Sequence, residues 1–166
     1  MGYDRRCLSK EACHWLAEVL AGYGHKTMEV NRSSPTPLIM FTVKQLGLHY
    51  GMAVTASHNP AIYNGIKVFT AGGRDADQTV TGKIEEQIKK IEGQNIPSVD
   101  YDAALEQGLI QEISPFNESI DSILKVQDVK KIKEARLRIA IDPMYGVSQS
   151  SLRTMLLTCR CDVDVI

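Results

Sequence analysis

Apolar residues in the first two thirds of the chain alternate between helical spacing and short continuous runs. An apolar stripe at helical spacing predicts a helix over 9–21, with Ser9 as its N-cap and Gly22 and Gly24 ending it. Further helices are predicted at 38–46 and 78–92, strands at 27–30, 52–55, 66–69 and 109–113, and turns or loops at 71–75 and 93–102. This alternation predicts an α/β domain over residues 1–113.

A second pattern begins at residue 114. A helix is expected over 114–126, with Ser114 as its cap and Pro115 in its first turn, followed by a charged linker at 127–136. A strand at 137–141, a helix at 148–158 and a strand at 161–166 then form a β-α-β unit, which predicts parallel strands.

The chain stops on the last of these strands. We therefore expect 114–166 to be the truncated start of a second α/β domain. Its open sheet edges should be poorly ordered, or paired with a neighbour in a dimer or a strand swap.

Charge and composition narrow the class of protein. Lys and Arg total 19 and Asp and Glu total 20, without a basic block, so neither a nucleic acid nor a membrane surface is expected as a partner. No apolar stretch approaches the ~20 residues of a membrane span, and no signal-peptide pattern is present. The four cysteines form neither a CxxC pair nor a zinc spacing, which predicts reduced thiols in a cytoplasmic protein.

The hexapeptide Thr-Ala-Ser-His-Asn-Pro at 55–60 is the chemically most informative segment. It places the Ser57 hydroxyl on a polar turn after an apolar strand, where α/β sheets usually bind ligands. Pro60 forces a turn, and Asn64-Gly65 is a hairpin signal that returns the chain to the next strand. The loop is therefore expected to have fixed ends and to expose the Ser57 hydroxyl at its polar tip.

A serine at its ordinary pKa is a poor nucleophile, and in phosphoryl transfer positioning and cations supply most of the help. The candidate cations are Lys67, Arg6 and Arg74. Other interpretations stay open on spacing alone: the hexapeptide as a plain turn, Lys67 as protection of a strand edge, and Arg6 as a solvated charge. His58 directly follows Ser57, and adjacent residues are not expected to align as nucleophile and base.

Several ordered segments resemble one family. Thr-Ala-Ser-His-Asn-Pro at 55–60 with Tyr-Asn-Gly-Ile-Lys at 63–67 closely resembles the phosphoserine loop of the α-D-phosphohexomutases, the phosphoglucomutases and phosphomannomutases. Gly-Tyr-Asp-Arg-Arg at 2–6, Ser-Pro-Thr-Pro at 34–37 and Asp-Pro-Met-Tyr-Gly at 142–146 are similar to further family segments. The resemblance implies a three-layer α/β/α domain with a mixed sheet over 1–113, followed by an incomplete second α/β domain.

The resemblance also implies a chemistry. Ser57 would carry a phosphoryl group, give it to a hexose monophosphate, and recover the other phosphate from the resulting bisphosphate. Mg²⁺ would be bound through the Ser57 phosphate. His58 and Lys67 match family positions that assist the transfer, and Arg6 matches an arginine near the same phosphate.

The resemblance covers roughly the first third of such an enzyme, without the start of its first domain. The magnesium motif D-G-D-x-D-R and the sugar and phosphate clamps would lie beyond the chain, so negligible turnover is expected from these residues alone. A non-catalytic phosphosugar-binding relative is the main alternative. An unrelated phosphoryl-transfer protein of the P-loop type is a third, which the missing G-x-x-x-x-G-K-[ST] disfavours. Thr55 favours glucose or mannose as the sugar, and the segment 63–65 is shared with phosphopentomutase-like relatives.

Overall fold

The computed structural model describes all residues from Met1 to Ile166. The chain divides into two compact units, Met1–Ile113 and Ser114–Ile166. Each unit is described by itself.

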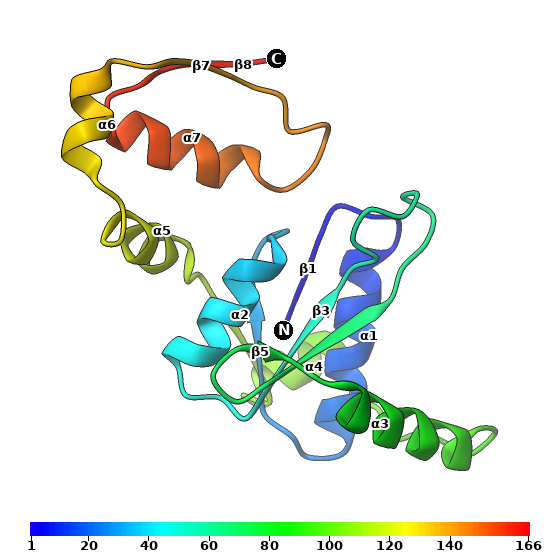
Figure 1. Ribbon diagram of the computed structural model, residues 1–166. Helices are drawn as coiled ribbons and strands as arrows, with labels where there is room; N and C mark the ends of the chain where they lie inside the picture. The colour runs from blue at the N-terminus through cyan, green and yellow to red at the C-terminus, as the bar shows by residue number, and fades with distance from the viewer. The chain divides into compact units, whose positions relative to one another are not determined.

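The first unit alternates helices and strands along the chain (Figure 1). In order, its elements are β1 (Gly2–Tyr3), α1 (Ser9–Gly22), β2 (Thr27–Val30), α2 (Thr36–Gln45), β3 (Tyr50–Val54), β4 (Ile66–Thr70), β5 (Arg74–Asp75), α3 (Gln78–Ile91), α4 (Tyr101–Glu106) and β6 (Ile110–Ile113).

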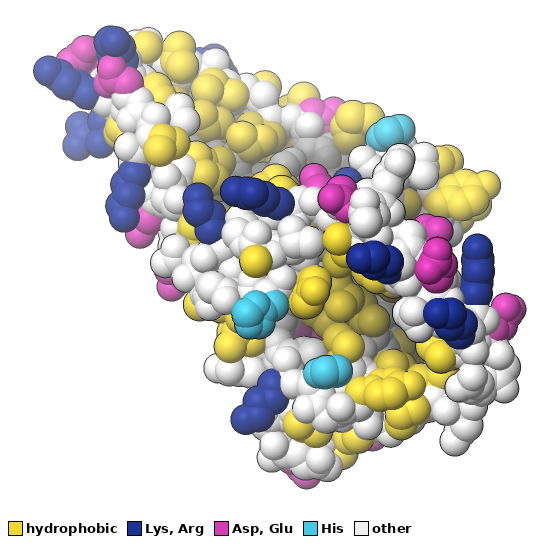
Figure 2. Space-filling model, turned by 60° about the horizontal axis from the view of Figure 1, so that its bottom comes forward, with side chains coloured by type: hydrophobic (Ala, Val, Ile, Leu, Met, Phe, Trp, Pro, Cys, Tyr) yellow, Lys and Arg dark blue, Asp and Glu magenta, His cyan; other side chains and the backbone are white.

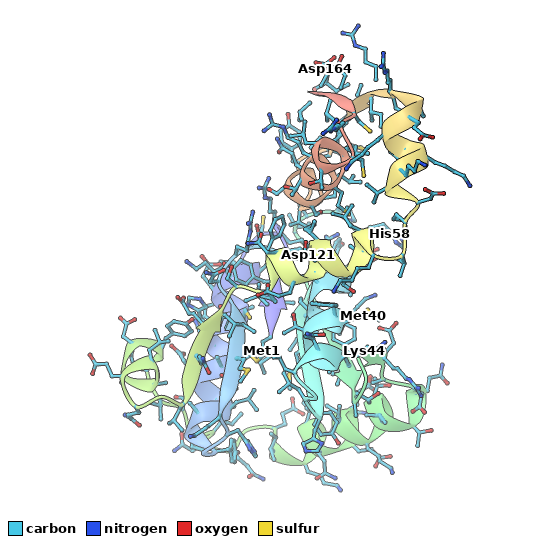
Figure 3. The ribbon with its side chains drawn as sticks, turned by 90° about the vertical axis from the view of Figure 1, so that its left-hand side faces the viewer. Met1, Met40, Lys44, His58, Asp121 and Asp164 are labelled. Carbon is cyan, nitrogen blue, oxygen red and sulfur yellow. The ribbon has the colours of Figure 1, made fainter.

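The strands of this unit form a mixed sheet. β1 pairs with β3 and β2 with β6 in parallel, whereas β4 is antiparallel to β3 and to β5. Val30 N–H donates to the Met1 carbonyl at 2.9 Å, and the Met1 amine donates to the Met28 carbonyl, which is the pattern of a parallel pair between β1 and β2. The strands form a four-stranded sheet in the order β1-β3-β4-β5 and a two-stranded sheet β2-β6, and the backbone hydrogen bonds of Met1 join the two sheets (Figure 3).

Helices cover both faces of the sheet. On one face, Ala17 and Ala21 of α1 pack with Ala104 of α4 and Ile110 of β6. On the other face, α2 packs on the sheet, and its residues Met40 and Lys44 are labelled in Figure 3. The core on this side is formed by Ile39, Ala53 and Phe69. The predicted three-layer α/β/α fold with a mixed sheet is confirmed.

Three short elements of this unit were not predicted from the sequence. β1 and β5 have two residues each, too few for a hydrophobic pattern, and form through pairing with their neighbours. Helix α4 begins at the end of the loop expected over 93–102 and continues to Glu106, and Asp100 caps it by accepting from the N–H groups of Asp102 and Ala103. Ser9 is the first residue of α1 rather than its N-cap, and Leu8 occupies the cap position with a φ of 56°.

The second unit comprises α5 (Phe116–Leu124), α6 (Val129–Ala135), β7 (Arg138–Ile141), α7 (Gln149–Thr158) and β8 (Asp162–Val165). β7 and β8 are parallel, with Arg138 opposite Asp162, so the predicted β-α-β unit is confirmed. The expected linker at 127–136 contains helix α6 instead, which Asp128 caps through the N–H of Lys131. Helix α5 begins after Pro115, and Ser114 does not cap it.

Charges of both signs are interspersed over the face of the molecule drawn in Figure 2, together with exposed hydrophobic side chains. None of the helices has the length and apolar character required to cross a bilayer.

Candidate functional site

The candidate site lies at the carboxyl ends of β1 and β3, which are neighbouring parallel strands. β1 leads into Asp4–Arg6, and β3 leads into Thr55 and the loop of residues 56–65, so both segments emerge at the same edge of the sheet. Figure 1 shows this loop beside the segment that follows β1. The sheet therefore brings together two motifs about 50 residues apart, at the edge where α/β sheets bind ligands.

Ser57 is held in an unusual backbone conformation. Its φ is 56°, in the left-handed region, which costs a non-glycine residue about 1–2 kcal/mol. Its N–H donates to Thr55 Oγ1 at 3.1 Å, and the N–H of Asn59 donates to the Ala56 carbonyl at 3.1 Å. The Ser57 side chain is exposed. Such strain, maintained by surrounding hydrogen bonds, is typical of functional loops.

The Thr55 hydroxyl links Ser57 to β1. Thr55 is 7% exposed, and its hydroxyl donates to Asp4 Oδ2 at 2.7 Å. Because this hydroxyl has one proton, donation to Asp4 leaves its lone pairs to accept the Ser57 N–H. The buried threonine thus connects the carboxylate of one strand end to the turn of the other.

Arg6 holds the loop by its backbone. Its Nη1 donates to the carbonyls of Asn59 and Pro60, at 2.6 and 2.9 Å, and lies 3.4 Å from the Tyr63 carbonyl. Its Nη2 donates to the Ser57 carbonyl, and its Nε lies 3.2 Å from Asp4 Oδ2. The side chain is only 10% exposed, so Arg6 is not the solvated charge that was one interpretation of the sequence.

A second set of bonds fixes the end of the loop. Asn64 Nδ2 donates to the Cys7 carbonyl at 2.7 Å and to Ser9 Oγ at 3.0 Å, and the Cys7 N–H donates to the Ala61 carbonyl at 3.1 Å. The chain does return to β4 at Ile66, but the Asn-Gly pair does not have the positive φ angles of the expected hairpin turn. Asn64 instead acts through its side chain.

The other predicted site residues differ in their distance from Ser57. His58 is exposed, and its Nδ1 lies 3.4 Å from Ser57 Oγ, a contact that was not expected between adjacent residues. Lys67 is opposite Ala53, near the loop end of β4, and is exposed. Arg74 is opposite Thr70, at the other end of β4, about 13 Å of strand away from the loop, so it is not a cation of this site.

Asp4, Thr55, Ser9 and Asn64 take part in the site although sequence reasoning gave them no such role. Asp4 and Thr55 lie inside motifs that the sequence analysis quoted, so a signal for them existed. Their hydrogen bonds span 51 residues and become visible only once β1 and β3 are paired.

A separate polar cluster is buried between β2, α1 and α4. Glu29 is 2% exposed, its Oε1 lies 3.2 Å from His14 Nε2, and the His14 ring stacks on Tyr101 at 3.8 Å. Burial raises the pKa of Glu29 and that of Tyr101, and it raises the pKa of the nearby Cys13 thiol to about 12. Burial lowers the pKa of the nearby Met1 amine, and the charge of the exposed Glu112 also acts on Glu29.

No group of three or more His, Cys, Asp or Glu side chains is arranged to hold a metal ion. The Asp4 carboxylate is engaged by Arg6, Ser9 and Thr55.

The fold and the loop define an α/β protein that presents a serine hydroxyl at the carboxyl ends of its parallel strands. The family described as phosphoglucomutase/phosphomannomutase, alpha/beta/alpha domain I, matches residues 1–95. The chain therefore belongs to the phosphoglucomutase/phosphomannomutase family, as the sequence motifs had indicated.

Individual relatives agree with this assignment. The chain is 36% identical over 149 residues to the phosphoglucomutase of Staphylococcus saprophyticus, a match that covers 88% of this chain and 27% of the relative. It is 29% identical to the phosphoglucosamine/phosphogalactosamine mutase of Sulfurisphaera tokodaii, over 80% of this chain and 28% of that protein. The structure described as a phosphomannomutase candidate from Thermus thermophilus superposes with a TM-score of 0.85 at 25% identity, over 99% of this chain and 36% of that one.

The chain thus spans about a quarter to a third of the length of these relatives. Their names refer to glucose, glucosamine, galactosamine and mannose phosphates, so membership of the family does not fix the sugar.

Proposed function

We propose that this chain supplies the phosphoserine of a phosphohexomutase, an enzyme that interconverts a hexose 1-phosphate and a hexose 6-phosphate. The observation that carries the proposal is the geometry of Ser57. Its exposed hydroxyl lies on a left-handed backbone that is held by Thr55, Asp4 and Arg6 at the carboxyl end of β3. Pre-organising a group in this way favours transfer because orientation is achieved before the reaction.

In the proposed cycle, the bond between phosphorus and Ser57 Oγ breaks while a bond forms to the free hydroxyl of a hexose monophosphate, whose proton is released. The resulting bisphosphate turns around, and its other phosphoryl group returns to Ser57 Oγ. The serine is phosphorylated again at the end, so the net reaction is an isomerisation.

The neighbouring side chains have distinct proposed roles. Lys67 offsets the negative charge of the phosphoryl group from the first residues of β4. His58, with Nδ1 at 3.4 Å from Ser57 Oγ, is placed to exchange a proton with that oxygen. Arg6 acts mainly on the loop carbonyls, although its family position lies near the phosphate.

Mg²⁺ is proposed as the cofactor, held through the Ser57 phosphate. When bound, it would add positive charge at the transferring group. The residues of this chain do not complete a metal site, so no step is derived through the metal.

Glucose is the proposed sugar, because Thr55 resembles the residue of glucose and mannose mutases and the phosphoglucomutase of S. saprophyticus is 36% identical. Mannose, glucosamine and pentose phosphates are the alternatives. A comparison of kcat/KM for glucose, mannose and glucosamine 1-phosphates in the natural gene product distinguishes them.

The proposal is tested by a coupled assay of glucose 6-phosphate formation with the gene product that carries these residues. Ser57→Ala should lower kcat/KM at least about a thousandfold, and Ser98→Ala, a change at another exposed serine, should leave it unchanged. Activity of Ser57→Ala within about twofold of the parent would refute the proposal. A parent that binds hexose phosphates without turning them over would favour the non-catalytic relative.

A further inference from the structure

Both oxygens of the Asp4 carboxylate are engaged beside the Ser57 loop. Its Oδ1 accepts from the Arg6 N–H and from the Ser9 hydroxyl, both at 3.0 Å. Its Oδ2 accepts from the Thr55 hydroxyl at 2.7 Å and lies 3.2 Å from Arg6 Nε. The Asp4 N–H continues the ladder with β3 by donating to the Val54 carbonyl at 3.2 Å, so its backbone is fixed as well.

The Oδ2 oxygen sets the direction of two other groups. It takes the only proton of the Thr55 hydroxyl, which leaves that oxygen to accept the Ser57 N–H. It also lies 3.2 Å from Arg6 Nε, an ion pair without a hydrogen bond from Nε, and so places negative charge beside the guanidinium whose Nη1 and Nη2 reach the loop carbonyls. Both supports of the Ser57 backbone, the Thr55 hydroxyl and the Arg6 guanidinium, therefore contact one carboxylate oxygen.

We propose that Asp4 is a positioning residue for Ser57: through the Thr55 hydroxyl and the Arg6 guanidinium, its carboxylate holds the serine in the left-handed conformation that presents its hydroxyl for phosphoryl transfer. The part of this statement that concerns transfer rests on the proposed function. The part that concerns the backbone of Ser57 does not.

The substitution Asp4→Asn distinguishes the roles of the two carboxylate oxygens, because it keeps one acceptor and replaces the other with a donor. An amide keeps the size of the side chain and retains an acceptor for the Arg6 N–H and the Ser9 hydroxyl. It places an NH₂ donor against the Thr55 hydroxyl and Arg6 Nε, which are themselves donors. Asp77→Asn is the matched control, because Asp77 caps α3 and Asn caps a helix about as well as Asp.

The first measurement is amide hydrogen exchange with NMR chemical shifts on the 166-residue chain. Asp4→Asn should speed exchange of the Ser57 N–H about tenfold or more and move the Ser57 Cα and Cβ shifts away from left-handed values, while Asp77→Asn changes neither. Unchanged exchange and shifts at Ser57 in Asp4→Asn would overturn the proposal, whatever the activity of the enzyme.

A second measurement needs no variant. In the parent chain, the Thr55 hydroxyl proton should exchange slowly with water and be observable by NMR, because it is donated to a carboxylate in a buried position. A freely exchanging hydroxyl proton would overturn the proposal even if Asp4→Asn failed to fold.

The third measurement addresses transfer in the gene product. Asp4→Asn should lower kcat about tenfold or more with KM for the hexose phosphate changed less than about twofold, since the sugar is not contacted. If Asp4→Asn altered the Ser57 backbone but left kcat unchanged, the proposal that this conformation serves phosphoryl transfer would be overturned. If Ser57→Ala were fully active while Asp4→Asn still changed the Ser57 backbone, the proposed function would fail and the positioning role would hold.

Discussion

Arg6→Lys tests whether Arg6 acts on the loop backbone or only on a phosphate. The guanidinium reaches the carbonyls of Ser57, Asn59 and Pro60 together, and an ammonium group keeps the charge without the planar fork. A hydrogen bond to a charged group contributes about 1.5–3 kcal/mol, and lysine should lose about two of them. Because water can solvate the exposed loop carbonyls again, we expect the free energy of unfolding to fall by about 2–3 kcal/mol.

The assay is urea denaturation of the unphosphorylated chain, followed by the fluorescence of Trp15, the single tryptophan, which lies on α1 in the first unit. The matched control is Arg74→Lys on the exposed strand β5 at the far end of β4, which should change stability by less than about 0.5 kcal/mol. Amide exchange in residues 56–65 should rise in Arg6→Lys alone. Equal stability of the two variants would refute the backbone role and leave Arg6 as a phosphate contact.

Three further predictions concern the first unit. Iodoacetamide should alkylate the exposed Cys7 in the folded chain. Cys13 should react only after unfolding, because it is buried and its pKa is raised to about 12. Equal labelling rates of the two thiols in the native state would contradict this burial. Burial raises the pKa of Glu29, so its contribution to stability is complete below the ordinary carboxyl pKa of about 4.3 and is lost as the pH rises through the folded value. Glu29→Gln should therefore flatten the decline of unfolding free energy with rising pH, and an unchanged pH profile would count against it. Gly73→Ala should cost about 3 kcal/mol or more in urea denaturation, because φ is 70° and a Cβ would lie 2.0 Å from a backbone carbonyl of α2, whereas Gly24→Ala, with φ of 77° and open space, should cost only about 1 kcal/mol.

Hydrophobic patterning predicted the elements that bury a face. The strands β2, β3, β4 and β6 and the helices α1 and α2 contribute most of the buried residues of the first unit, and each was expected within a few positions. The missed helix α4 contributes a single buried residue, Ala104. The elements that it missed bury little or are very short. Helix α6 has no buried residue and forms from a charged segment with an Asp128 cap, so its apolar pattern carried no signal.

The site residues that are close together in sequence could be predicted, whereas the contacts between distant segments could not. Ser57 and its neighbours could be read from one hexapeptide, and the structure places them on a single loop. The role of Asp4 could not, because its partner Thr55 is 51 residues away and the two meet only when β1 pairs with β3. Arg74 was proposed on charge alone, and the register of β4 with β5 separates it from the loop.

The most direct test of the central claim is phosphopeptide mapping of the gene product purified from its own cells. The account predicts one phosphate of about 80 Da on Ser57, removed by incubation with a hexose monophosphate, restored by the hexose bisphosphate, and absent in Ser57→Ala. A fully active gene product in which Ser57 is never phosphorylated, or in which the phosphate does not exchange with the sugar, would contradict the account.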